Sequence, residues 1–253
     1  MNPTHPANGP AYLIHGFRLL TRPGLKRFVI IPLLINIILF AGFLAILQHF
    51  FKQFDHWIAQ VLPHWLLWLE GLIHLTFFVG FLLVFLYTFV AVANLVSAPF
   101  NGFLAEKVEC YLTGKKPVSR TFLDNVKDTP RILARQLALI GYYLPRALVL
   151  LIFFFVPVIQ LVAALFWFGF NAWFMTLQYL DYPTDNHQIP LRDVHVFMWQ
   201  NRLLSLSFGM SILVMTLIPV LNFFIIPAAV AGATQWWVEK GKNASTDDLS
   251  VTL

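Results

Sequence analysis

The chain has 253 residues, of which 58% are hydrophobic and 11% charged, and its mean hydropathy is +0.71. Charged residues make up about a quarter of a typical soluble domain, so this composition excludes a soluble globular protein and indicates an integral membrane protein. The net charge of +5 would suggest nucleic-acid binding in a soluble chain, but here the cations flank apolar segments, as membrane topology requires.

Two long apolar segments come first along the chain. Residues 28–51 form a run of about 24 residues, which at about 1.5 Å per residue reaches about 36 Å, enough for a tilted transmembrane helix. Residues 66–97 are longer and predict a second transmembrane helix. Trp57 suits a membrane interface in the connection between them, whose one basic residue is Lys52, so we expect this connection to face outward.

Residues 98–136 have a different character, with seven Lys or Arg between Asn101 and Gln136. Gly114 is expected to end a short amphipathic helix that begins near Phe103. We predict a cytoplasmic helical segment here. A solvated basic loop that sets topology is the simpler interpretation, and salt bridges with these cations are the simpler role for Glu106 and Glu109.

Two proline-broken apolar regions follow, at residues 137–180 and 203–238. The stretch before Pro157 and the stretch after Pro227 are each about eleven residues long, or about 16 Å, against a hydrocarbon core of about 30 Å. We therefore predict two re-entrant helical hairpins, with two fully spanning pairs as the alternative.

The tips of the two hairpins resemble each other, as VPVIQ ends in Gln160 and IPVLN ends in Asn222. Exposed backbone at membrane depth is tolerated only where protein or water covers it, so these two amides are candidate pathway residues. Capping of a proline break is the equally good alternative for both.

The distribution of basic residues predicts the orientation. Both kinds of hairpin return the chain to the side it left, so both termini, including the polar tail at residues 239–253, are expected in the cytoplasm. Every Lys and Arg except Lys52 then lies in the cytoplasm or at its interface. The predicted fold is thus one all-α membrane domain, residues 1–253.

The stretch Leu19–Phe40 reads LLTRPGLKRFVIIPLLINIILF and places cations, proline and glycine directly before an apolar run. Thr21 is a candidate N-cap, Pro23 suits a first helical turn, and Gly24 offers no side chain to obstruct a ligand. The amides from Gly24 onward would then be unpaired, and such a helix N-terminus attracts anions. An oxyanion site and a lipid-headgroup anchor both fit these features.

Four segments in this order, over nearly the whole chain, resemble the CysZ family of bacterial sulfate permeases: GFRLLTRPGLKRFVIIPLLIN (Gly16–Asn36), NLVSAPFNGFLAEKVE (Asn94–Glu109), YLDYPTDNH (Tyr179–His187) and IPVLNFFIIPAAVAGAT (Ile218–Thr234). The resemblance implies sulfate uptake across the inner membrane for cysteine synthesis. It also implies that the Arg-Pro-Gly-Leu-Lys-Arg loop binds sulfate, through Arg22, Gly24, Leu25, Lys26 and Arg27. Lys26 stands where the family pattern has an arginine, which leaves two-pronged contact to Arg27.

Other polar residues are weaker candidates. Asp181, Asp185 and His187 suit proton transfer or metal binding, but a hydrogen-bonded connector is the simpler interpretation. Glu106 and Asp181 are the candidate proton carriers if sulfate entry is coupled to protons. We expect no metal site, no cofactor and no enzymatic activity. No phosphate-binding loop occurs, so the chain is not expected to hydrolyse ATP itself. We also expect no ATPase subunit, because the sequence shows no motif for coupling to one. A homo-oligomer is expected, and a structural or lipid-binding membrane protein is the alternative function.

Overall fold

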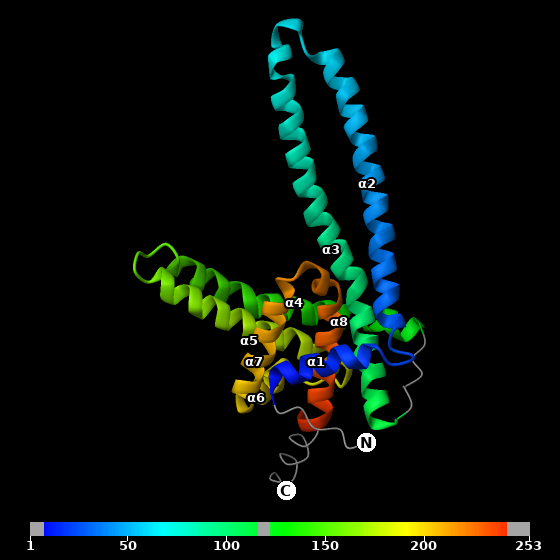
Figure 1. The fold of residues 1–253 in the computed structure, drawn as a ribbon, viewed down its shortest axis with the longest axis vertical. Helices are drawn as coiled ribbons and strands as arrows, with labels where there is room; N and C mark the ends of the chain where they lie inside the picture. Colours follow the sequence, from blue (N-terminus) through cyan, green and yellow to red (C-terminus); the bar gives the residue numbers. More distant parts are fainter. Residues whose placement is uncertain (1–7, 116–121, 242–253) are drawn as a thin grey trace. The chain divides into compact units, whose positions relative to one another are not determined.

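The computed structural model describes residues 8–115 and 122–241, and all regular structure within them is helical (Figure 1). Four helical segments in these ranges are long and apolar enough to cross a bilayer: Arg27–Ile58, Glu70–Phe89, Ala134–Phe153 and Gln160–Asn186. The chain is an all-α membrane protein, as its composition predicts. It divides into two compact units, one from Arg27 to Phe100 and one that combines the residues before and after this stretch.

The unit from Arg27 to Phe100 is a helical hairpin. Helix α2 (Arg27–Val61) and the first part of α3 (Glu70–Thr113) are joined by a short 3-10 helix, η1 (His64–Leu69). Phenylalanine rings pack between the two helices, and the closest pair is Phe54 stacked on Phe77 with ring centroids 3.6 Å apart. The predicted connection at residues 52–65 is thus helical as far as Val61, and α2 is longer than its apolar run.

The predicted amphipathic helix near residues 103–112 is not a separate element, because α3 continues without interruption to Thr113. Asn101 and Gly102 lie inside α3, and contacts to a later helix hold them there: Asn101 Nδ2 donates to the Tyr182 hydroxyl, and Asn186 Nδ2 donates to the Gly102 carbonyl. Gly114 has φ +69 and directly follows the helix, which confirms the predicted stop.

The second unit has α1 (Gly9–Leu20) crossing α8 (Pro219–Trp236) at its centre. Asn8 caps α1 by accepting a hydrogen bond from the Ala11 amide. The crossing is close because Gly16 has no side chain: a Cβ there would lie 2.0 Å from the Ala228 carbonyl oxygen. Tyr12 is fully buried beside Trp236 and donates to Glu239 of the π-helical turn η2 (Trp237–Gly241).

A second close crossing joins α5 (Gln160–Asn186) to α7 (Arg202–Thr216). A Cβ on Gly209 would lie 1.7 Å from the Ala172 carbonyl oxygen, so only glycine fits. Thr176 donates to the Ser205 carbonyl at 2.6 Å, which satisfies polar groups in a buried interface. The short α6 (Leu191–Gln200) connects the two helices.

In each hairpin, the arm that the prolines predict to be short is longer in the structure. Helix α4 (Phe122–Phe153) passes unbroken through Arg146, and α5 runs back from Gln160, so each arm of the first hairpin reaches the length of a span. In the second hairpin, Pro227 lies inside α8 and does not begin an arm. Here α7 has 15 residues and α8 has 18, or about 22 and 27 Å, which falls short of a core of about 30 Å. Re-entrance of either hairpin stays a prediction.

Candidate functional site

The basic loop between α1 and α2 is a β-turn. The Leu25 amide donates to the Arg22 carbonyl at 3.2 Å, Pro23 takes the second position and Gly24 takes the third with φ +88. Proline followed by a residue with positive φ is the signature of a type II turn, in which the third position favours glycine. Turn geometry thus explains the Pro-Gly pair.

This geometry corrects the predicted helix start. Thr21 is the C-cap of α1, with its amide and hydroxyl both bonded to the Arg18 carbonyl, and α2 begins only at Arg27. The Leu25 amide is committed to the turn and is not free for a ligand. The amides of Gly24 and Lys26 differ from that of Leu25, because neither donates a hydrogen bond within residues 8–115 and 122–241.

The cations of the loop are exposed to solvent. The exposed residues of the loop include Arg22, Gly24, Lys26 and Arg27. The Leu25 side chain, by contrast, is buried and anchors the turn. In the part of the chain that the structure describes, no carboxylate forms an ion pair with these three cations. The loop also has no acidic neighbour in the sequence, because Asp55 is the first acidic residue of the chain. The loop is therefore an uncompensated positive surface that can receive an anion.

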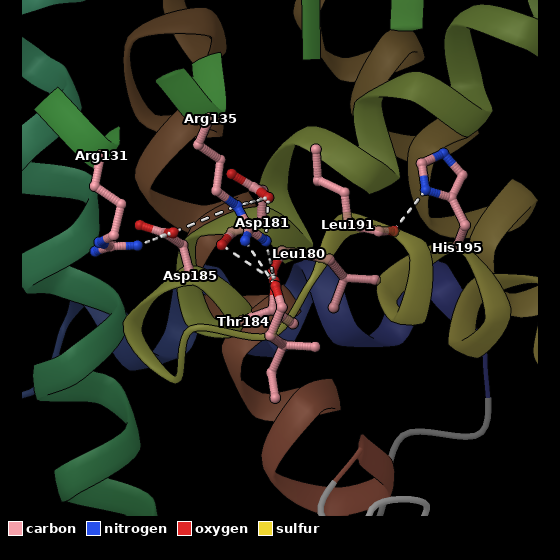
Figure 2. A network of polar contacts seen from close by, with 9 residues as sticks. Arg131, Arg135, Leu180, Asp181, Thr184, Asp185, Leu191 and His195 are labelled. Carbon is pink, nitrogen blue, oxygen red and sulfur yellow. Dashed lines mark hydrogen bonds and ion pairs between the residues drawn. The ribbon is translucent and has the colours of Figure 1, made fainter. Parts of the chain in front are cut away.

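A second polar cluster joins α4 to the C-terminal end of α5 (Figure 2). Arg135 donates from Nε to Asp181 and from Nη1 to the Ile189 carbonyl, at 2.7 and 2.6 Å, and its Nη2 reaches Thr184. Arg131 pairs with Asp185, which also lies 3.4 Å from the Nε of Arg135. The side chains of Arg135 and Asp181 are only 12% and 5% exposed, so this is a buried network.

The same end of α5 is tied to the end of α3. Besides the contacts of Asn101 and Gly102, His187 Nε2 lies 2.8 Å from Glu109 Oε2. Pro183 lies within the helix, so the DYPTDNH segment is a helix end and not a proline turn. Its polar groups already have partners on α3 and α4, an arrangement that ties helices together. No cluster of three metal-ligating side chains occurs among the described residues.

The two candidate pathway amides and the two candidate proton carriers lie on different helices or near opposite ends of the same helix. Asp181 is held in the network with Arg135, and Gln160 is exposed at the start of α5. Asn222 lies on α8, where its side chain is outside the described part. Glu106 differs from the others because its Oε1 is buried and has no hydrogen-bond partner among the residues that the structure describes.

Sequence reasoning missed the two arginines of the network. A signal was present: Arg131 and Arg135 are four residues apart on α4, and Asp181 and Asp185 are four residues apart on α5. Residues at this spacing share a helix face, so two antiparallel helices can match the two pairs.

Comparison with known proteins places this chain among its relatives. Residues 12–227 match the model of the family described as sulfate transporter CysZ/etoposide-induced protein 2.4. A sulfate transporter CysZ of Pectobacterium atrosepticum is 43% identical over 245 residues, covering 95% of this chain and 88% of the relative. One of Salmonella typhimurium is 44% identical over 240 residues, covering 93% of this chain and 94% of the relative. The chain belongs to the sulfate transporter CysZ/etoposide-induced protein 2.4 family.

Proposed function

We propose that this chain transports sulfate into the bacterial cytoplasm across the inner membrane, where it supplies sulfur assimilation and cysteine synthesis. The relatives that align with almost the full length of this chain are named sulfate transporters. The observation that carries the proposal is the exposed basic loop directly before a helix long enough to span the membrane. It offers three cations, none of which pairs with a carboxylate among the described residues.

We assign sulfate binding to the loop from Arg22 to Arg27. Arg22, Lys26 and Arg27 supply charge, and charge-assisted hydrogen bonds from such groups are about twice as strong as neutral ones. Gly24 supplies the turn and an unobstructed approach, because a Cβ there would meet no atom within 4 Å. Leu25 contributes by anchoring the loop, since its side chain is buried and its amide is used.

We also propose that both termini and the basic loop face the cytoplasm, because segments rich in Lys and Arg are retained on that side of the membrane. We further propose that the protein works as a homo-oligomer, since polar groups in a bilayer need a lining of protein or water. Gln160 and Asn222 are the proposed polar groups at the hairpin tips. Cysteines placed at these two positions are expected to resist an impermeant reagent from the outside if the tips end within the bilayer.

Energetics favour coupling to protons. Moving a divalent anion inward against 100 mV costs about 4.6 kcal/mol, so a passive pore would hold internal sulfate about a thousandfold below external sulfate. Three protons for each sulfate make entry electrically favourable. Of the two candidate carriers, Glu106 suits the role better than Asp181, because one oxygen of Glu106 is buried without a partner whereas Asp181 is paired with Arg135.

The deciding experiment measures sulfate binding and uptake by the purified chain. Wild-type protein is expected to bind sulfate in preference to chloride, and Arg27→Ala to lose most of this binding. Arg192→Ala, which removes an exposed arginine of α6, serves as the matched control and should bind normally. Equal, salt-screened affinity for sulfate and chloride would instead support the alternative, a lipid-anchoring membrane protein.

Uptake into proteoliposomes with a clamped membrane potential and an internal pH dye tests the coupling. Sulfate entry that acidifies the interior and responds to an imposed pH gradient supports a proton-coupled carrier. Entry that leaves internal pH unchanged refutes coupling and leaves a passive pathway.

A further inference from the structure

Arg146 is an isolated charge in an apolar hairpin. Between Arg135 and Asp181 it is the only charged residue of the sequence, and it lies within the Ala134–Phe153 segment that can span a bilayer. Ionisable side chains in such segments are rare and need a polar partner. No carboxylate pairs with Arg146 in the part of the chain that the structure describes.

Arg146 lines a groove between α4 and α5. It has a volume of about 910 Å³ and, apart from Arg146, apolar walls, which include Val149 and Leu150 of α4 and Leu165 and Phe166 of α5. Gly169 lines the same groove, and a Cβ there would meet no atom within 4 Å. The groove is therefore open space between two helices and lies on a surface rich in exposed apolar residues.

Aromatic stacking fixes the position of the guanidinium. Arg146 Nη1 donates to the Tyr142 carbonyl at 2.7 Å, and the guanidinium carbon lies 4.0 Å from the centroid of the Tyr142 ring. His195 of α6 lies against that same ring, with centroids 4.6 Å apart. No other hydrogen bond of Arg146 occurs within the described ranges, so most of its five donors are available to a ligand in the groove that this residue lines.

We propose that this groove binds a membrane phospholipid, with the lipid phosphate on Arg146 and an acyl chain along the apolar walls. The chemistry of the groove selects this ligand. A small oxyanion such as sulfate requires several converging donors to replace its hydration, and the groove offers one cation among apolar side chains. A phospholipid matches both features, because it combines an anion with an apolar chain. This proposal is independent of the proposed sulfate site.

The test uses the full-length protein, delipidated in a neutral detergent and titrated with phosphatidylglycerol under native mass spectrometry. Wild-type protein is expected to hold one tightly bound lipid. Arg146→Gln is expected to weaken this binding by about tenfold or more, the loss typical of one charge-assisted contact. Gly169→Leu is expected to weaken it similarly by filling the groove while leaving Arg146 in place.

Two variants serve as matched controls. Gly141→Leu adds the same side chain to α4 at a position with equally open space outside the groove lining, and Arg192→Gln removes an arginine elsewhere. Both should bind lipid like wild type, and circular dichroism confirms that all four variants fold. Equal lipid binding by Arg146→Gln and wild type overturns the proposal. Displacement of the lipid by sulfate indicates an anion site instead, and a change of oligomeric state in Gly169→Leu without loss of lipid indicates a subunit contact.

Discussion

The guanidinium of Arg135 on α4 meets the carboxylate of Asp181 on α5, with Nε and Nη2 both 2.7 Å from Oδ1. Removing one partner of a buried ion pair leaves an uncompensated charge and costs about 3–5 kcal/mol. We therefore expect Arg135→Gln and Asp181→Asn each to lower the unfolding temperature in detergent markedly. Replacing both residues together should cost less than the sum of the single changes.

Arg131 provides the control for this prediction. It pairs with Asp185 on the same two helices, but its side chain is 35% exposed against 12% for Arg135. Asp185 also lies 3.4 Å from Arg135 Nε and keeps this cationic neighbour when Arg131 is removed, so Arg131→Gln should be milder than Arg135→Gln. Equal destabilisation by Arg131→Gln and Arg135→Gln would show that burial does not set the strength of the network.

The spans of this fold are readable from sequence because each has a long apolar run. Hydropathy locates a helix core but not its ends, which explains why α2 and α3 exceed their predicted limits. Asn101 and Gly102 resemble a break, yet they stay helical because α5 supplies their hydrogen bonds. That information lies about eighty residues further along the chain and is invisible to local patterns.

The sequence shows where the basic loop lies and which cations it carries, but not the conformation of its backbone. Thr21, Pro23 and Gly24 fit both a helix N-terminus and a turn after a helix, since the same residue types serve both. The hydrogen bonds of Thr21 and Leu25 decide in favour of the turn. Pairing of arginines with aspartates likewise depends on how α4 and α5 align, which no single segment encodes.

Gly16 should be essential for the packing of α1 on α8. A Cβ at this position would lie 2.0 Å from the Ala228 carbonyl oxygen, so the two helices must separate. Overpacking of this kind costs about 1–3 kcal/mol, and we expect Gly16→Ala to lower the unfolding temperature. Gly141→Ala is the control, because the space around Gly141 is open. Equal stability of the two variants would contradict the close crossing.

Tyr12 should make stability depend on alkaline pH. Its pKa is raised above the ordinary value because the ring is buried, and its hydrogen bond to the Glu239 carboxylate raises the pKa further. A raised folded-state pKa gives stability that is complete below the unfolded value, about 10, and is lost as pH rises towards the folded value.

We therefore expect the unfolding temperature of wild type to fall more steeply above pH 10 than that of Tyr12→Phe. Calorimetry of both proteins from pH 8 upward measures the difference. Parallel profiles would mean that Tyr12 ionises equally easily in the folded and unfolded chains.

Gly24 separates the conformation of the basic loop from its charge. Gly24 has φ +88, a backbone conformation that costs a residue with a side chain about 1–2 kcal/mol of conformational free energy. The cost is not steric crowding by neighbours, because a Cβ on Gly24 would meet no atom within 4 Å. Gly24→Ala should weaken sulfate binding by up to about tenfold with little change in global stability. Gly24→Asn should recover part of the affinity, because asparagine tolerates positive φ. Unchanged affinity in Gly24→Ala would place sulfate away from this turn.

Cys110 reports on the charge of Glu106. Burial raises the pKa of the Cys110 thiol, the negative charge of Glu106 raises it further, and Lys107 lowers it. Because the thiolate is the reactive form, the single cysteine should react slowly with a maleimide at neutral pH.

Glu106→Gln should move the pH midpoint of this reaction downward, and Lys107→Gln should move it upward. A shift of the midpoint reflects ionisation, whereas a change in the maximal rate reflects access, so the full pH profile separates the two effects. A midpoint for Glu106→Gln equal to that of wild type would contradict an influence of the Glu106 charge on Cys110. A group that carries protons must alternate between charged and neutral forms, so the same Glu106→Gln protein should also lose the response of sulfate uptake to a pH gradient.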